Sequence, residues 1–306
     1  MNLLLLGKNG QVGRELQRTL LPLGQVSAFG RDEADLKNPD GLLGLLKERK
    51  PDIIVNAAAY TAVDKAETDE KAAYAINAAA VDVLAQYAKT NGTLLVHYST
   101  DYVFDGEKKE AYLETDATNP QSVYGKSKRA GEEVILNSRC NTLIFRTSWV
   151  FSAHGNNFIK TILRLAQERD NMNIVADQFG APTCAELIAD VTAHAIIGYR
   201  RNQLTGGIYH LTSGGETTWH GLACYAVQRA HENRMQLKLK PENIQPIPTE
   251  AYPLPAQRPK NSRLNTGSLA NSLGLHFPDW SLYVDRVIRE LCNQDLNLMN
   301  KNWSKP

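Results

Sequence analysis

Three side chains in the middle of the chain have the types needed to reduce a ketone. Tyr124 and Lys128 are four positions apart, so on a helix they lie on one face and the Lys128 ammonium can approach the Tyr124 phenol. This spacing is common by chance, and its place in the chain is what gives it meaning. Ser99-Thr100 directly follows an apolar stretch, 93–98, about one helix upstream of Tyr124. The sequence therefore predicts that a hydroxyl, a phenol and an ammonium converge.

These three groups fit hydride transfer to a carbonyl carbon. A phenol has an ordinary pKa of about 10, so it needs a nearby positive charge to exchange protons near neutrality. Lys128 and a nicotinamide ring can both supply that charge. Thr100 would then orient the ketone, while Tyr124 gives a proton to the oxygen.

A glycine motif near the N-terminus is typical of a nucleotide cofactor site. Gly7, Gly10 and Gly13 are spaced as Gly-x-x-Gly-x-x-Gly, after a short apolar run and at the start of a helical pattern. At such a turn, backbone amides and the helix N-terminus can hold a pyrophosphate. The alternative is a tight turn that needs glycine only for its backbone geometry.

The residues after the second apolar run bear on the choice between NADPH and NADH. NAD-preferring sites place Asp or Glu there to bind the ribose 2′-hydroxyl, but this chain has Gly30 and Arg31. Arg31 is expected to hold a 2′-phosphate, which favours NADPH and leaves NADH possible. Alternatively, Arg31 is a solvated loop residue and Asp32 or Glu33 contacts the ribose.

The elements that position these groups alternate between strands and helices, which predicts a parallel sheet covered on both faces. The expected strands are 3–6, 25–29, 52–55, 93–98 and 142–146, and the expected helices are 12–20, 42–46, 72–88 and 123–136. Open sheets of this kind bind ligands at the carboxyl ends of their strands, where Ser99-Thr100 lies. The predicted fold class is α/β, a doubly wound parallel sheet (Rossmann-like) with a smaller C-terminal substrate-binding lobe.

Two domains are expected from the length and from a change in regularity after Phe151. Residues 1–150 form the predicted dinucleotide-binding domain. Residues 151–306 are mainly the substrate-binding lobe, with about 185–215 returning to the first domain. Six prolines between Pro241 and Pro259 exclude a helix or a central strand there and predict a rigid extended loop.

Composition narrows the possible partners. Thirty-four Lys and Arg against thirty-three Asp and Glu give a net charge of +1, which argues against nucleic-acid and acidic-membrane binding. The 306 residues include four scattered cysteines, which favours a reducing compartment. No apolar run is long enough to span a membrane. A cytoplasmic protein that binds small molecules is expected.

Several motifs resemble those of the extended short-chain dehydrogenase/reductase superfamily: Gly7 to Gly13, Asn56 to Ala59, Ser99 to Phe104 and Tyr124 to Lys128. More narrowly, the chain resembles the dTDP-4-dehydrorhamnose reductase family. The narrower resemblance covers residues 2 to about 265 and is carried by Val63 to Glu67, Arg146 to Val150, Gly155 to Phe158, Asp177 to Thr183 and Arg258 to Leu264. It implies reduction of dTDP-4-dehydro-β-L-rhamnose to dTDP-L-rhamnose with NAD(P)H.

The resemblance also implies roles for individual residues. Cofactor contacts are implied for Gly10, Gln11, Val12, Asp35, Leu36, Ala59, Tyr60, Thr61, Tyr124 and Lys128. Sugar-nucleotide contacts are implied for Thr100, Asp101 and Trp149, although a tryptophan after a strand is also typical of a core. Arg258 and Arg263 are expected to pair with the diphosphate, with surface charges as the alternative. Gly30 stands where some members have Asp, which casts doubt on the use of NADH.

Magnesium and a homodimer are implied by the resemblance alone. Glu15, Glu186 and Glu290 are the expected ligands, in an oxygen cage across a two-fold interface, with solvated surface glutamates as the alternative.

Two other functions stay open. Thr100-Asp101 is followed by Tyr102 rather than by a second carboxylate, which argues against a dehydratase. A reductase of another 4-keto deoxysugar nucleotide is one alternative. A non-catalytic nucleotide-binding regulatory subunit of the same fold is the other.

Overall fold

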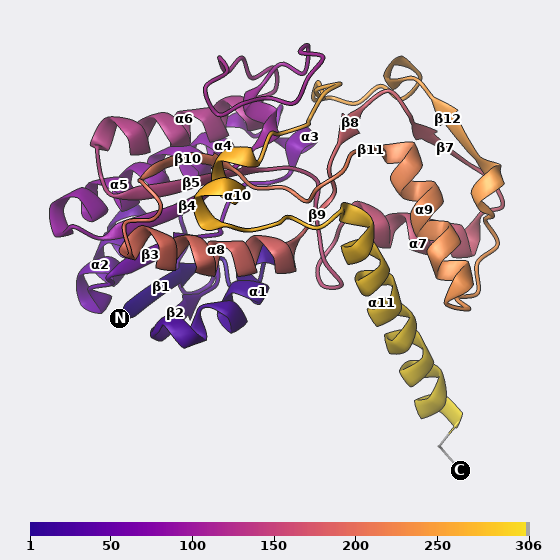
Figure 1. The fold of residues 1–306 in the computed structure, drawn as a ribbon, viewed down its shortest axis with the longest axis horizontal. Coiled ribbons are helices and arrows are strands. Elements are labelled where there is room, and N and C mark those ends of the chain that lie inside the picture. The colour runs from indigo at the N-terminus through magenta and orange to yellow at the C-terminus, as the bar shows by residue number, and fades with distance from the viewer. Residues whose placement is uncertain (304–306) are drawn as a thin grey trace. The chain divides into compact units, whose positions relative to one another are not determined.

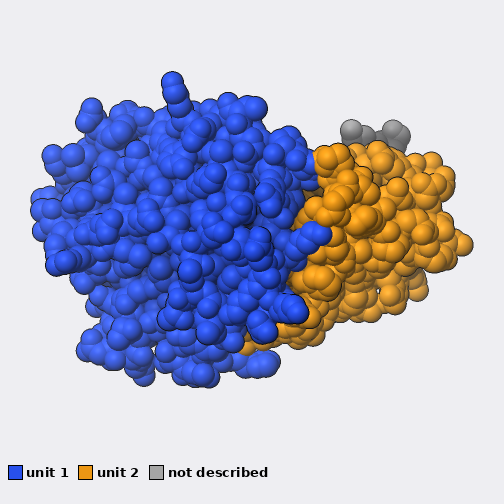
Figure 2. Space-filling model, turned by 90° about the horizontal axis from the view of Figure 1, so that it is seen from above, with its two compact units in different colours: residues 1–148, 185–212, 254–276 blue, residues 149–184, 213–253, 277–306 orange. Residues whose placement is uncertain are grey.

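The computed structural model describes the backbone of residues 1–303 and the side chains of residues 1–293. The chain divides into two compact units, coloured separately in Figure 2. Unit 1 consists of Met1–Ser148, Ala185–Thr212 and Leu254–His276, and unit 2 consists of the stretches 149–184 and 213–253 and the chain from 277 onward. The sequence assigns 254–276 to the second lobe, whereas the structure places this segment in unit 1.

Unit 1 is built on a six-stranded sheet in which every pairing is parallel, in the order β10-β5-β4-β3-β1-β2 (Figure 1). The strands are β1 (Asn2–Leu6), β2 (Gln25–Phe29), β3 (Ile53–Asn56), β4 (Leu94–Thr100), β5 (Thr142–Thr147) and β10 (Gly207–His210). The predicted doubly wound parallel sheet is confirmed. β2 and β3 lie on opposite sides of β1, so the strand order reverses at the carboxyl ends of β1 and β3. In such sheets this reversal is where ligands bind.

Helices cover both faces of the sheet, so its strands are apolar on both sides. Leu3, Leu4, Leu5 and Leu6 of β1 are all at most 1% exposed. One face packs against α2 (Pro39–Arg49), α5 (Ala80–Asn91) and α6 (Val123–Ser138). The helices α1 (Gln11–Thr19) and α8 (Ala185–Arg200) pack together against the other face (Figure 1).

The alanine-rich stretch predicted as one helix contains an irregular turn. It comprises α4 (Glu70–Tyr74), a π-helical turn Ala75–Ala79, and α5. Such turns occur often at functional sites, because they turn a side chain out of the regular helical register. Unit 1 is completed by α3 (Val63–Ala66), α10 (Gly267–Leu273) and the 3-10 turns Leu21–Leu23 and Asp101–Val103.

Unit 2 has three helices and short strands. The helices α7 (Phe158–Glu168), α9 (Trp219–Glu232) and α11 (Trp280–Trp303) share a core that includes Ile159, Ala226 and Val284. The strands are β6 (Val150–Phe151), β7 (Met172–Val175), β8 (Phe179–Gly180), β9 (Thr183–Cys184), β11 (Thr217–Thr218) and β12 (Ile244–Ile247). They pair as β6-β9, β7-β12 and β8-β11.

The proline-rich segment is more ordered than the predicted loop. It contains two 3-10 turns, Pro241–Asn243 and Thr249–Ala251, on either side of β12. Pro246 lies within β12, which a two-stranded sheet tolerates because each strand has an unpaired edge. Among the described helices, none has the length and hydropathy needed to cross a membrane.

Candidate active site

The glycine turn after β1 forms a tight cradle. Gly7 has a φ of +87°, and a Cβ there would lie 2.7 Å from the amide nitrogen of Ala58, in the loop after β3. A Cβ on Gly13 would lie 2.0 Å from the Gly7 carbonyl oxygen, and the Gly10 amide donates to that oxygen at 2.9 Å. The turn therefore requires glycine at Gly7 and Gly13.

The helix that follows this turn presents its N-terminus to the switch point of the sheet. Gly10 caps α1 without a side-chain hydrogen bond, and the first turn, which includes Gln11 and Val12, carries no acidic residue. Helix N-termini of this kind favour anions through their amides and their dipole. The cradle and the helix end together fit a dinucleotide pyrophosphate.

At the end of β2, Glu33 rather than Arg31 is held against the glycine turn. The Gly30 amide donates to Glu33 Oε2 at 2.8 Å, and Lys8 Nζ lies 2.5 Å from the same oxygen. The hydrogen bonds from Lys8 and Gly30 lower the pKa of the Glu33 carboxyl. Arg31 is exposed. Glu33 is thus the carboxylate of this loop that is paired with the glycine turn.

Asp35 and Leu36 follow on this loop. Asp35 Oδ1 accepts a hydrogen bond from the Lys37 amide at 3.0 Å. Leu36 is buried in the core beside α2. Their side chains therefore hold the loop in place.

The loop after β3 is held by Asn77, in the π-helical turn. Asn77 Oδ1 accepts from the Tyr60 amide at 2.8 Å, and Asn77 Nδ2 donates to the Tyr60 carbonyl and to Ser127 Oγ, each at 3.0 Å. The loop that includes Ala59 and Thr61 is thereby tied to α6. The sequence analysis did not predict a role for Asn77, which is buried in the structure. The feature that could have indicated it is an amide side chain inside an alanine-rich helical stretch.

Thr100 and Tyr124 come together at the carboxyl edge of the sheet. Thr100 is the last residue of β4, and its side chain lies beside the Tyr124 phenol at the start of α6. Burial raises the pKa of Tyr124 to about 12, and the neighbouring Thr100 hydroxyl opposes that rise. A Cβ on Gly125 would lie 2.3 Å from the Tyr102 carbonyl oxygen, so glycine lets α6 approach this edge closely.

Asp101 adds a buried carboxyl beside this pair. The Thr100 hydroxyl donates to Asp101 Oδ1 at 3.0 Å. Burial raises the pKa of Asp101 to about 6, and hydrogen bonds from Ser262 and Thr100 oppose that rise. Ser262 belongs to the segment 254–276, which lies in unit 1.

Lys128 is buried on the same helix, and its nitrogen contacts two residues of β4. Lys128 Nζ donates to the Tyr98 carbonyl oxygen at 2.6 Å and lies 3.2 Å from His97 Nε2. Burial lowers the pKa of Lys128 to about 8, and Glu132 opposes this decrease. Sequence reasoning placed the ammonium near the Tyr124 phenol and missed His97, a polar residue inside an apolar strand.

The two arginines predicted to bind the diphosphate form hydrogen bonds that stabilise loops of unit 1. Arg258 pairs with Asp64 of α3 through contacts of 3.0 and 2.8 Å, and Arg263 Nε donates to Asn261 Oδ1 at 2.8 Å. Arg263 also donates to the Lys109 carbonyl. Neither arginine is a simple surface charge.

Trp149 begins unit 2, in a left-handed conformation with a φ of +48°. Its ring stacks on Trp219, with 3.6 Å between centroids and 13° between planes. A Cβ on Gly180 would lie 2.7 Å from this ring. The half-buried indole is therefore held rigidly by its own unit.

The three glutamates proposed as metal ligands are divided between the units. Glu15 of α1 and Glu186 of α8 lie in unit 1, on two helices that pack together. Glu290 of α11 lies in unit 2, with its Oε1 3.6 Å from His154 Nε2. Among the residues with described side chains, no three His, Cys, Asp or Glu are grouped so as to hold a metal ion.

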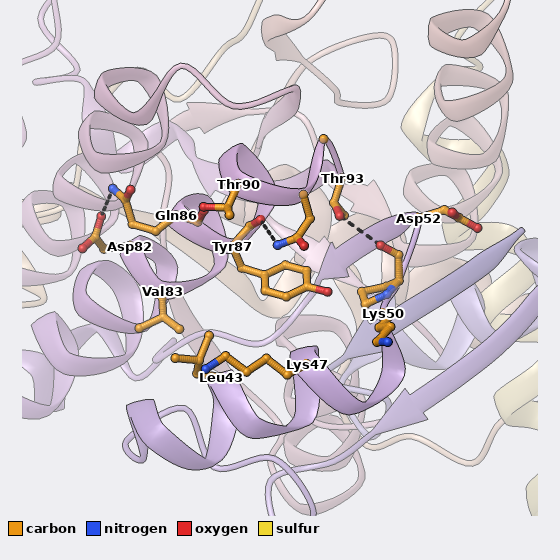
Figure 3. A pocket seen from close by; sticks show the side chains of 13 residues that line it. Leu43, Lys47, Lys50, Asp52, Asp82, Val83, Gln86, Tyr87, Thr90 and Thr93 are labelled. Atoms are coloured by element: carbon orange, nitrogen blue, oxygen red, sulfur yellow. Dashed lines mark hydrogen bonds between the residues drawn. The ribbon is translucent and has the colours of Figure 1, made fainter.

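An open pocket lies at the opposite edge of the sheet, between α2 and α5 (Figure 3). Its lining includes Lys47, Gln86 and Tyr87, together with Asp52 and Thr93, which immediately precede β3 and β4. Because these residues lie at the amino ends of the strands, the pocket is separate from the Thr100–Tyr124 pair. Ligands of doubly wound sheets bind at the carboxyl ends.

A parallel doubly wound sheet, a glycine cradle at its switch point and a Thr-Tyr-Lys set at its carboxyl edge define a nicotinamide-dependent reductase of the short-chain dehydrogenase/reductase type. Residues 1–293 match the family model described as RmlD substrate binding domain. A dTDP-4-dehydrorhamnose reductase from Burkholderia thailandensis is 51% identical over 298 residues, which are 96% of this chain and 100% of the relative. The chain belongs to the dTDP-4-dehydrorhamnose reductase family.

Solved structures agree with this assignment. The dTDP-4-dehydrorhamnose reductase of Clostridium acetobutylicum superposes with a TM-score of 0.88 at 36% identity, covering 95% of this chain and 99% of that one. The Bacillus anthracis reductase, solved in complex with NADP, gives a TM-score of 0.84 at 33% identity, covering 94% and 99%. The fold and the family are thus established over nearly the whole chain.

Proposed function

We propose that this protein reduces dTDP-4-dehydro-β-L-rhamnose to dTDP-L-rhamnose with NAD(P)H as the hydride donor. The observation that carries the proposal is the Thr100–Tyr124 pair at the carboxyl edge of the sheet, in a chain that matches reductases of this name over nearly their full length. A sugar 4-ketone needs a hydrogen-bond donor and a proton source at its oxygen, and this pair supplies both.

The chain's own residues bind and orient the reactants. Gly7, Gly10, Gly13 and the first turn of α1 would hold the cofactor pyrophosphate, and the nicotinamide would supply the hydride. Tyr124 gives its proton to the carbonyl oxygen, and Thr100 turns its hydroxyl proton from Asp101 Oδ1 to the same oxygen when the ketone is bound. The further cofactor contacts proposed are with Gln11, Val12, Arg31, Asp35, Leu36, Ala59, Tyr60, Thr61 and Lys128. The sugar-nucleotide contacts proposed are with Asp101, Trp149, Arg258 and Arg263.

The test of this function is cofactor oxidation by purified protein with a panel of dTDP- and UDP-linked 4-keto sugars. Turnover is expected with the dTDP-4-dehydrorhamnose substrate. Faster turnover of a different sugar nucleotide would favour a related ketoreductase. No turnover with any substrate, despite cofactor binding, would favour a regulatory subunit.

Cofactor choice should depend on the charges at the end of β2. Replacing Arg31 by alanine is expected to lower the ratio of kcat/KM for NADPH to that for NADH by about tenfold or more, because a charge-assisted hydrogen bond contributes about 1.5–3 kcal/mol. The matched change is Glu33→Gln, which removes the carboxylate that repels a 2′-phosphate and should raise the same ratio. If only the Glu33 variant changes the ratio, Arg31 has no part in cofactor selection.

Arg258 should affect the sugar nucleotide more than the cofactor. The Arg258→Ala variant is expected to raise the substrate KM by about tenfold, with little change in NADPH affinity, if its guanidinium meets the diphosphate. Its partner provides the control, since Asp64→Asn leaves the guanidinium in place with weaker pairing. Equal increases in KM for the two variants would mean that the Arg258–Asp64 pair only holds the loop.

Magnesium and a homodimer stay predictions. In this prediction, Glu15, Glu186 and Glu290 come together across a two-fold interface. Gel filtration of the parent and of Glu186→Gln, each with and without a chelator, tests both ideas. A dimer insensitive to both treatments would remove the metal from assembly.

A further inference from the structure

His97 is a fully buried imidazole in direct contact with the buried lysine of the site. It lies on β4, is 1% exposed, and places Nε2 at 3.2 Å from Lys128 Nζ. Its other ring nitrogen, Nδ1, lies 3.2 Å from Asn56 Nδ2 at the end of β3. The proposed function gives His97 no role, although two polar neighbours hold both of its nitrogens.

The orientation of the Asn56 amide is fixed by the backbone. The Ala58 amide donates to Asn56 Oδ1 at 3.2 Å, so the oxygen of the side-chain amide faces Ala58 and its NH₂ group faces His97. Turning the amide over would place two N–H donors against each other at Ala58. Asn56 Nδ2 therefore donates, and His97 Nδ1 accepts.

The tautomer of His97 follows from this contact. Burial, together with the nearby Lys128, lowers the pKa of His97 well below its ordinary value, so the ring is neutral. A neutral imidazole carries one proton. Because Nδ1 accepts from Asn56, that proton is on Nε2 and points at Lys128.

The proton on Nε2 matters for the charge of Lys128. An ammonium has three donors and no lone pair, so it cannot accept from the imidazole N–H. A neutral amine can accept from His97 while donating to the Tyr98 carbonyl. The other charged group facing this cluster is Glu132 on α6, which favours the ammonium and is itself paired with Arg146 and Arg129.

We propose that His97, held by Asn56 as the Nε2–H tautomer, is a positioning residue that destabilises the ammonium form of Lys128 and so sets the pH range in which this lysine is charged. The inference deepens the proposed function and rests on it, because Lys128 is proposed as the source of the positive charge that supports proton transfer by Tyr124. His97 would thus limit turnover at alkaline pH without contacting the substrate.

The lysine titration can be measured without any substrate. In protein labelled with [13Cε]lysine, the signal that disappears in Lys128→Met reports the pKa of Lys128, and we expect a midpoint more than one pH unit below the ordinary value of about 10.4. Nitrogen-15 spectra of the His97 ring should show the proton on Nε2. A Lys128 midpoint near the ordinary value, or a proton on His97 Nδ1, would overturn the proposal in the parent protein itself.

Two variants then test whether His97 is the cause of the lowered pKa of Lys128. In His97→Gln the side-chain oxygen can accept from the ammonium, so the Lys128 midpoint should rise by about one pH unit or more, and the alkaline decrease in kcat should move with it. Tyr98→Phe is the matched control, since it removes a buried hydroxyl on the same strand and keeps the carbonyl that contacts Lys128. An unchanged midpoint in folded His97→Gln, or an equal rise in the control, contradicts the proposal. A low Lys128 midpoint in a protein that reduces no sugar nucleotide would refute the proposed function and leave this inference standing.

Discussion

Tyr124→Phe is expected to lower kcat by about a hundredfold or more while leaving NADPH affinity close to that of the parent. The substitution removes only the phenol oxygen and its proton, which the forming alkoxide must receive. The ring still packs edge-on against Tyr102, with 5.5 Å between centroids, so the start of α6 should keep its place. Stopped-flow measurement of NADPH oxidation, together with fluorescence titration of NADPH, separates turnover from binding.

The control for this variant is Tyr102→Phe. It removes the hydroxyl of a half-buried tyrosine whose ring packs edge-on against the Tyr124 ring. We expect a much smaller loss of turnover. Equal losses would show that the effect comes from disturbed packing at the sheet edge, and Tyr124 would then not be the proton donor.

Replacing Glu132 by glutamine should destabilise the fold by about 3–5 kcal/mol, because it leaves a buried charge without its partner. Glu132 of α6 is fully buried and pairs with Arg146 of β5 through contacts of 2.8 and 2.7 Å. The Arg146 guanidinium also lies over the Phe104 ring, 5.0 Å from its centroid. This ion pair fixes α6 to the sheet one turn beyond Lys128.

Urea unfolding of Glu132→Gln and Glu133→Gln measures this effect. Glu133 is the adjacent acid, is 53% exposed and pairs with Arg129, so its loss should cost at most about 1 kcal/mol. The double change Glu132→Leu with Arg146→Met should recover much of the stability, since a buried ion pair can be replaced by apolar side chains of similar volume. Equal destabilisation by the two single changes would mean that burial of the pair contributes little.

The predictions that succeeded from sequence depend on local periodicity. The apolar run Leu3–Leu6, the glycine spacing and the helical pattern around Leu16 each predict an element that the structure contains. The predicted strand bounds 25–29 agree with those of β2. Alternation of such elements is enough to predict a parallel sheet, because parallel strands require crossover helices.

The irregular features of the fold were harder to predict from the sequence. The π-helical turn at Ala75–Ala79 interrupts a stretch whose composition is that of an ordinary helix, and β12 contains a proline that usually excludes a strand. Each depends on a partner distant in sequence: Asn77 contacts Tyr60, and β12 pairs with β7. Periodicity within a short stretch of sequence carries no information about partners that lie far away in the chain.

The sequence by itself determined the fold class, the cofactor cradle and the residue types of the proposed chemistry, because those depend on spacing within one turn or one helix. Only the tertiary structure decided which groups touch. It pairs Arg258 with Asp64, places Glu33 against Lys8, and turns Lys128 toward His97. Each of these contacts joins residues at least twenty-five positions apart in the sequence. Their charges are set by burial and by neighbours that folding alone brings together.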